Sequence, residues 1–226
     1  MFAVIDHFEL EREVVCIAFN YVDRYLLAAG GVIDKRQFQL LAMTCLYLSI
    51  KVHGGYIMAT GSPSTMKTML MLSRGHYSTE EMESMEYDIL QRLQWHVHPP
   101  TPQLILRLLL PESFQHFHEI FDLANFMIEL SVTDYFFVPY KPSETAAAAL
   151  FGALERLFTH SSIQLDHSLM IRLKPMETPR VIDCKERLLS IYCACGATEE
   201  AHGDGSSLSG NDRTASPVSV LTSHFR

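Results

Sequence analysis

The sequence has little positive charge, no long apolar run and no stretch in which apolar and polar residues alternate. Its 18 lysines and arginines are outnumbered by 26 aspartates and glutamates, which gives a net charge of −8. Because phosphate backbones are bound by basic surfaces, this deficit argues against nucleic acid as the main partner. The longest apolar stretch, residues 40–50, is far shorter than the roughly 20 residues of a membrane-spanning helix. We therefore expect neither a nucleic acid ligand nor a membrane span.

Neither the cysteines nor the first residues have the pattern expected of a secreted protein. Acidic residues appear repeatedly between positions 6 and 13, too early for the apolar core of a secretory signal. The cysteines are odd in number, which does not suit a complete set of disulfide bonds; they are Cys16, Cys45, Cys184, Cys193 and Cys195. These features predict a reduced, soluble, intracellular protein.

Motifs that carry chemistry are absent as well. No glycine-rich pattern that cradles phosphate occurs, and no serine, cysteine or threonine lies in a known nucleophile motif. The His-x-His pairs at 96–98 and 116–118 have no cysteine or carboxylate at a known metal-ligand spacing. Cys-x-Cys at 193–195 fits small buried hydrophobic residues better than ligands. We expect no catalytic residue, no metal and no cofactor, and hence a protein that is not an enzyme.

What the sequence does have is helical periodicity from one end to the other. The apolar residues of segment 11–27 recur at steps of three and four, and Gly30-Gly31 follows as a helix end. Two segments have the spacing of a capping box, in which two residues near a helix start cap each other. The two predicted boxes are Asp34 with Gln37 and Ser78 with Glu81.

The helices divide into two groups. Three prolines at positions 99, 100 and 102 forbid a continuous helix there and separate two helical bundles. The last helix of the second bundle is predicted to begin at Pro179 and to end at Gly196. Beyond it the chain is mostly serine, threonine, glycine and charged residues, a composition typical of disorder. The prediction is an all-α protein with bundles at residues 1–99 and 100–197 and a disordered tail at 198–226.

Four charged residues interrupt otherwise apolar helices. Asp23 fits either an exposed helix position or an internal ion pair, and Arg24 fits a solvated charge. Lys51 lies near a predicted helix C-terminus, where the helix dipole favours a cation by a few tenths of a kcal/mol. Glu86 fits a solvated helix face. Taken singly, these ordinary explanations are sufficient.

Taken together, the segments that contain these charges match a family. "AFNYVDRYL", "FQLLAMTCLYLSIK" and "YSTEEMESMEYDILQRLQWHVHPPTP" resemble the cyclin box in order and spacing. "ELSVTDYFFVPYKPSETAAAAL" resembles the C-terminal cyclin fold, so that the resemblance covers about residues 3–197. It implies two consecutive cyclin-fold bundles of the cell-cycle type. It also implies a regulatory subunit that binds and activates a cyclin-dependent Ser/Thr protein kinase, controls cell-cycle progression, and is located in the nucleus or cytoplasm.

The resemblance assigns roles to individual residues. It implies that Lys51 binds the backbone of the kinase and that Glu86 orients this lysine. It also implies residues that build the cyclin box, and residues of a groove that binds substrates and inhibitors with Arg-x-Leu-type motifs. The kinase-binding residues are Lys51 and Glu86, the structural residues are Asp23 (a buried aspartate) and Leu40 (a core leucine), and the groove residues are Phe38 and Gln39.

The sequence departs from the family pattern in three places. Relatives begin the first helix with Met-Arg and carry a tryptophan further on, whereas Met1 falls just after that tryptophan position. We therefore expect the first bundle to lack the N-terminal half of its first helix, including the arginine that pairs with the Asp23 position and one wall of the docking groove. "KVHGG" replaces acidic residues that many cyclins carry after the lysine, and the loop at 52–66 is lengthened.

Other functions fit the sequence less well. The runner-up is a cyclin-fold scaffold or degenerate paralogue that does not activate a kinase. A DNA-binding transcription factor with a cyclin fold would need a basic surface and usually a zinc ribbon, and the sequence has neither. Ser62 and Ser216 each precede a proline in predicted loops, so we expect proline-directed phosphorylation there.

Overall fold

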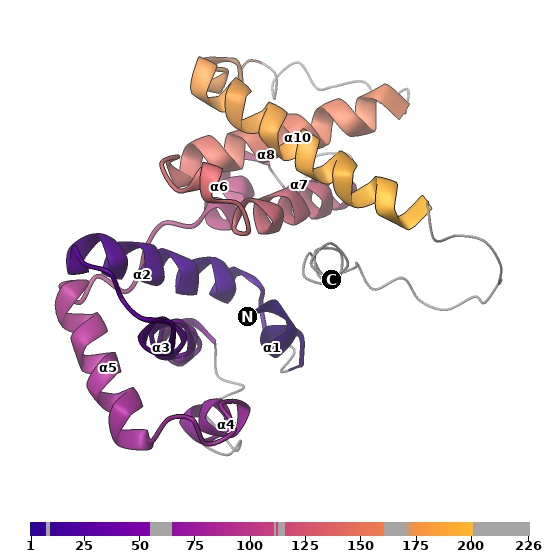
Figure 1. Ribbon diagram of the computed structural model, residues 1–226. Helices are drawn as coiled ribbons and strands as arrows, with labels where there is room; N and C mark the ends of the chain where they lie inside the picture. The colour runs from indigo at the N-terminus through magenta and orange to yellow at the C-terminus, as the bar shows by residue number, and fades with distance from the viewer. Residues whose placement is uncertain are drawn as a thin grey trace. The chain divides into compact units, whose positions relative to one another are not determined.

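The computed structural model describes residues 1–7, 10–54, 65–110, 112, 116–160, 171 and 173–200. In these ranges the secondary structure is helical and contains no strand (Figure 1), which confirms the all-α prediction. The chain divides into two compact units, Met1–Pro99 and Pro100–Arg226, at the proline cluster. None of the helices in the described ranges is both long and apolar enough to cross a membrane.

The first unit is built around one central helix. Its elements are α1 (Phe2–His7), α2 (Glu13–Ala29), α3 (Lys35–His53), α4 (Thr65–Leu72) and α5 (Thr79–Arg92). Figure 1 shows α3 end-on, with α2, α4 and α5 packed around it. Tyr21 of α2, Leu41 and Leu48 of α3, and Ile89 of α5 are buried together in the core between these helices.

The middle of α3 is buried on every side. All residues from Thr44 to Ile50 are shielded from solvent, which explains why this part of the sequence is almost unbrokenly apolar. The polar exceptions bond within the helix: the Thr44 hydroxyl donates to the Leu40 carbonyl, and the Ser49 hydroxyl donates to the Leu46 carbonyl, each at 2.8 Å. A hydroxyl satisfied in this way avoids most of the cost of burying a polar group. The helix reaches solvent again only at its last turn, where Lys51 lies.

Helix ends in this unit follow the local sequence signals. Gly30 has φ 62° and its N–H donates to the Leu26 carbonyl, which ends α2 as predicted. Both predicted capping boxes are present. Asp34 and Gln37 begin α3, and Ser78 and Glu81 begin α5.

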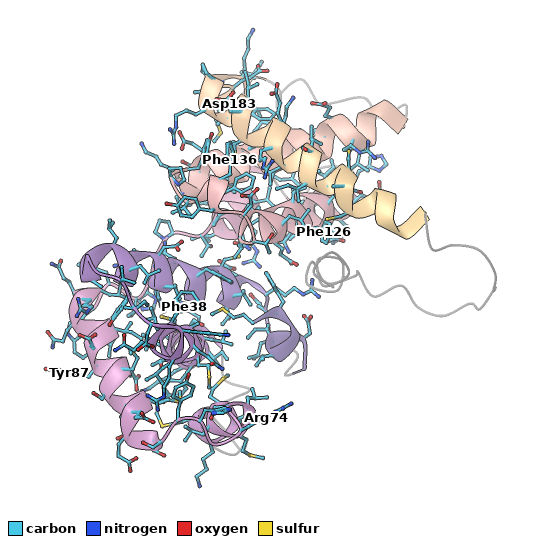
Figure 2. All side chains as sticks on the ribbon, in the orientation of Figure 1. Phe38, Arg74, Tyr87, Phe126, Phe136 and Asp183 are labelled. Atoms are coloured by element: carbon cyan, nitrogen blue, oxygen red, sulfur yellow. The ribbon has the colours of Figure 1, made fainter. Side chains whose placement is uncertain are left out.

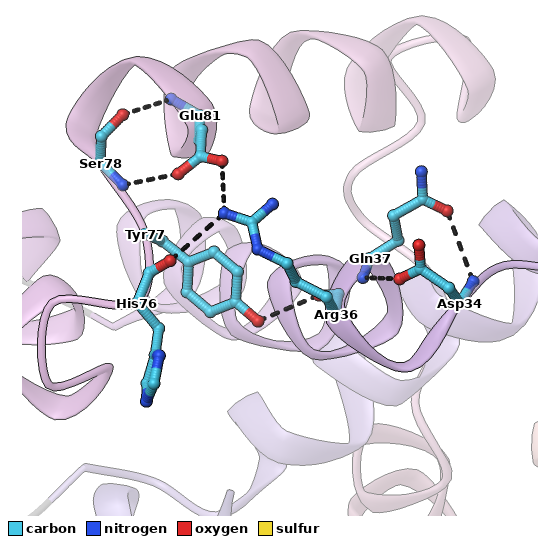
Figure 3. A network of polar contacts seen from close by, with 7 residues as sticks. All are labelled: Asp34, Arg36, Gln37, His76, Tyr77, Ser78 and Glu81. Atoms are coloured by element: carbon cyan, nitrogen blue, oxygen red, sulfur yellow. Dashed lines mark hydrogen bonds and ion pairs between the residues drawn. The ribbon is translucent and has the colours of Figure 1, made fainter.

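The capping box of α5 extends into a network that joins α5 to the first turn of α3 (Figure 3). The Arg36 guanidinium donates to Glu81 Oε1 at 2.6 Å and to the His76 carbonyl at 3.3 Å. The Tyr77 hydroxyl donates to the Arg36 carbonyl at 3.0 Å. Glu81 therefore accepts both from Arg36 and from the Ser78 backbone N–H, so one carboxylate caps a helix and links it to its neighbour.

The second unit is also built around a central helix. Its elements are α6 (Pro102–Leu109), α7 (Phe117–Ser131), η2 (Tyr135–Phe137), α8 (Pro142–His160), η3 (Lys174–Met176) and α10 (Pro179–Glu200). α8 contacts α6, α7 and α10. Its alanines at 146–149 are completely buried, and a Cβ added at Gly152 would lie 3.0 Å from Met127 Sδ. Small side chains thus let α8 approach its neighbours closely.

One predicted helix end is wrong. α10 does not stop at Gly196 but continues to Glu200, so residues 198–200 of the predicted tail are helical. A glycine inside a helix costs about 1 kcal/mol relative to alanine but keeps its backbone hydrogen bonds. It therefore weakens a helix without necessarily ending it. Residues 201–226 lie outside the described residues.

We predict that Ser78→Ala lowers the free energy of unfolding of the first unit by about 1 kcal/mol, because the Glu81 N–H loses its side-chain acceptor. Chemical denaturation followed by circular dichroism measures the change. Ser84→Ala is the matched control, since Ser84 is an exposed residue within the same helix. Equal stability of the two variants would show that the Ser78 side chain does not stabilise the start of α5.

Candidate functional site

Lys51 and Glu86 form an ion pair between α3 and α5. The distance from Lys51 Nζ to Glu86 Oε1 is 2.9 Å, although the two residues are 35 positions apart in the chain. The two partners differ in burial: 53% of the lysine side chain is exposed, but only 12% of the glutamate side chain. The Lys51 ammonium is therefore accessible to solvent, while the Glu86 carboxylate that pairs with it is nearly buried.

The Lys51 ammonium also lies over an aromatic ring. Tyr47, one helical turn earlier on α3, is buried, and its ring centroid is 5.4 Å from Lys51 Nζ. The hydrogen bond that Lys51 donates to Glu86 raises the pKa of Lys51, against a smaller opposing effect of burial, and Tyr47 adds to the increase. The lysine is thus fully charged at neutral pH. An ammonium has three N–H donors, so one that is half-exposed can donate to Glu86 and to a partner at once.

Two exposed aromatic residues follow Glu86 in the sequence, one on α5 and one in the turn after it. Tyr87 follows Glu86 on α5 and is 62% exposed, and Trp95 follows the end of α5 and is 61% exposed. Figure 2 shows Tyr87 on the outer side of α5. Neither residue was predicted from the sequence to belong to the site. The available signal was that Tyr87 lies off the buried stripe of α5, which includes Met82 and Ile89.

The turn that carries Trp95 is held by Arg24. Gln94 and Trp95 both have positive φ, 52° and 61°, a conformation that is uncommon outside glycine. The Arg24 guanidinium donates to the carbonyls of His96 at 2.8 Å and Leu93 at 3.3 Å, on either side of these residues. Arg24 is therefore not the solvated charge that its sequence position suggested. It binds the backbone at the C-terminal end of α5.

Asp23 is exposed on α2, whereas the resemblance implied a buried aspartate. Among the described residues it has no hydrogen-bond or ion-pair partner, and its neighbour Arg24 points its donors at α5 instead. The protein around Asp23 still removes enough water to raise the pKa of its carboxyl group above the ordinary value. The ionised carboxylate is therefore slightly less favourable in the folded chain than in the unfolded chain.

The other residues singled out from the sequence lie as follows. Leu40 is buried at the start of the core segment of α3, in keeping with a structural role. Phe38 and Gln39, one turn into α3, are exposed. Ser62 and Ser216 lie outside the described residues, as does most of the lengthened loop at 52–66.

The histidine pairs take part in packing and polar contacts. The rings of His53 and His98 meet edge to face with centroids 4.9 Å apart, and His53 also contacts the Val97 carbonyl at 2.7 Å. His116 lies 3.4 Å from Glu119. Within the described ranges, no group of three histidine, cysteine or acidic residues is arranged to hold a metal ion.

Asp23→Asn tests whether Asp23 is exposed, as the structure has it, or is part of a buried ion pair. The pKa of Asp23 is higher in the folded chain than in the unfolded chain. The wild type therefore loses stability as the pH rises from the lower of these two pKa values to the higher. The variant should therefore be equal or more stable at pH 7, by no more than about 0.5 kcal/mol. The difference should vanish below both pKa values. Denaturation at pH 7 and pH 3 measures it, with Glu83→Gln, at another exposed acidic residue, as the control. A loss of about 3–5 kcal/mol would instead indicate a buried ion pair.

Comparison with known proteins identifies both units. Residues 1–98 match the family "Cyclin, N-terminal domain", and residues 100–203 match "Cyclin, C-terminal domain". The chain is 30% identical over 196 residues to cyclin-A1-2 of Arabidopsis thaliana, covering 83% of this chain and 41% of the relative. It is also 30% identical over 146 residues to the G2/mitotic-specific cyclin S13-7 of Glycine max, covering 65% of this chain and 53% of the relative.

The chain thus spans about half the length of these curated relatives, or less. A solved chain in the CAK complex from Chaetomium thermophilum bound to ATP-gamma-S covers 92% of this chain and 77% of its own length, at 16% identity and a TM-score of 0.49. That likeness is too low to support an argument. The two domain matches and the cyclin relatives are sufficient: this chain belongs to the cyclin family.

Proposed function

We propose that this protein is the regulatory subunit of a cyclin-dependent Ser/Thr protein kinase, which it binds and activates in the control of cell-cycle progression, in the nucleus or cytoplasm. The observation that carries the proposal is the Lys51 ammonium, which Glu86 holds at the surface of the first cyclin domain at 2.9 Å. The sequence resemblance matches Lys51 and Glu86 to the lysine and glutamate through which cyclins bind their kinases. Their pairing supports the same role here.

The mechanism requires no chemistry from this chain. A cyclin presses a preformed helical face against a mobile helix of the kinase and moves that helix's glutamate toward the catalytic lysine. The lysine–glutamate pair inside the kinase must form before ATP is correctly held. Since the cyclin binds the active kinase conformation more tightly than the inactive one, its binding shifts the population toward the active form.

The Lys51 site has the properties that such an interface needs. The half-exposed ammonium can donate to kinase carbonyl groups, while the nearly buried Glu86 carboxylate fixes its position. Tyr87 and Trp95 expose aromatic surface on α5 and on the turn after it. Aromatic residues are enriched at protein interfaces, where a few buried anchors supply most of the binding energy.

We expect Lys51→Met and Glu86→Gln each to weaken kinase binding by about 2–5 kcal/mol, because each leaves a charge or acceptor of the interface without its partner. Two kcal/mol is a loss of roughly 30-fold in affinity. Binding to a panel of purified cyclin-dependent kinases is measured by biolayer interferometry, with circular dichroism to confirm that the variants are folded.

Lys185→Met is the matched control for this experiment. Lys185 also forms a lysine–glutamate pair between two helices, with Glu155 at 2.6 Å, but it lies in the second unit. Its loss should leave kinase affinity unchanged. If the folded wild type binds no kinase in the panel, the proposal is wrong and a scaffold role without kinase activation takes its place.

A further inference from the structure

Lys51 is held from two directions by different kinds of contact. Glu86 approaches it from α5 with a carboxylate oxygen at 2.9 Å. Tyr47 lies on α3 itself, four residues before Lys51, with its ring centroid 5.4 Å from the ammonium. Residues four apart on a helix lie on one face, so the tyrosine is placed along the path that the lysine side chain follows. Tyr47 is buried, which gives its ring a fixed position.

An ion pair alone holds an exposed lysine poorly. A lysine side chain has many rotamers, and pairs at the surface gain little because fixing those rotamers offsets the Coulomb attraction. A ring face adds a second attraction through its negative quadrupole, effective within about 6 Å. The 5.4 Å distance at Lys51 is within that limit. Ring and carboxylate together leave the ammonium fewer positions than either contact alone.

We propose that Tyr47 is a positioning residue that holds the Lys51 ammonium, through its ring face, in the place from which the lysine meets its partner. The consequence for kinase binding rests on the proposed function, whereas the positioning itself is a property of this chain alone. A purely structural role is the alternative, because a buried tyrosine also fills the core. The ring face and the core volume are separated by two substitutions: Tyr47→Phe keeps the ring, and Tyr47→Leu keeps only an apolar side chain.

The first test is made on the chain alone by NMR with lysine labelled at the ε-carbon. Protons held over a ring face are shifted upfield, so the Lys51 ε-CH2 signal, assigned by its loss in Lys51→Met, should be shifted in the wild type and in Tyr47→Phe. It should return to the ordinary lysine position in Tyr47→Leu. Lys185 is the internal reference, since it is also a lysine paired with a glutamate but lies in the second unit. An unshifted wild-type signal overturns the proposal.

The second test is a double-mutant cycle on kinase affinity. Tyr47→Leu should weaken binding roughly two- to fivefold, the range expected for a cation over a ring at a partly exposed site. Tyr47→Phe should bind like the wild type. In the Lys51→Met background Tyr47→Leu should have no further effect, because the group that it positions is gone. An equal loss in both backgrounds would show that Tyr47 contributes only packing.

The two tests separate this inference from the proposed function. If the wild type binds no kinase but shows the shifted Lys51 signal, the proposed function fails and the positioning by Tyr47 stands. If the wild type binds a kinase but Tyr47→Leu binds equally well, the proposed function stands and the positioning by Tyr47 fails. Thermal unfolding of Tyr47→Leu, followed by circular dichroism, confirms that the variant compared in both tests is folded.

Discussion

The burial of α3 is the constraint on which the rest of the first unit depends. Because its middle is shielded on all sides by α2, α4 and α5, the helix cannot rotate or slide without opening the core. Its two ends are fixed as a result, and both are linked to glutamates of α5. Arg36 near the start pairs with Glu81, and Lys51 near the end pairs with Glu86.

Most of the helix boundaries could be predicted because their causes are local. A capping box needs only two residues three positions apart, and the boxes that begin at Asp34 and Ser78 both formed. Glycine is a less reliable signal, because it ends a helix only where the following contacts favour a left-handed conformation. Gly30 meets that condition with φ 62°, whereas the helix containing Gly196 continues beyond it.

The site was predictable only in part, because its geometry depends on which helix faces pack together. Lys51 and Glu86 were singled out through a family resemblance, and the packing of α3 on α5 brings them to 2.9 Å. Nothing local distinguishes Arg24 from a solvated arginine, yet the fold directs it to the carbonyls at the end of α5. Asp23, its neighbour, was expected to be buried and is exposed instead, since the two side chains leave α2 in different directions.

The Lys51–Glu86 pair at the end of α3 is unequally buried, unlike the Arg36–Glu81 pair at the start of the helix. The Arg36–Glu81 pair is exposed on both sides, 59% and 38%, so neither charge loses much hydration. Glu86 is only 12% exposed, and a carboxylate so placed loses hydration that a single exposed lysine does not fully replace. A fold that needed only a link between α3 and α5 could use a fully exposed pair, or an apolar contact, at lower cost. The cost is understandable if the carboxylate holds the ammonium where its remaining N–H groups can donate to acceptors on a partner protein.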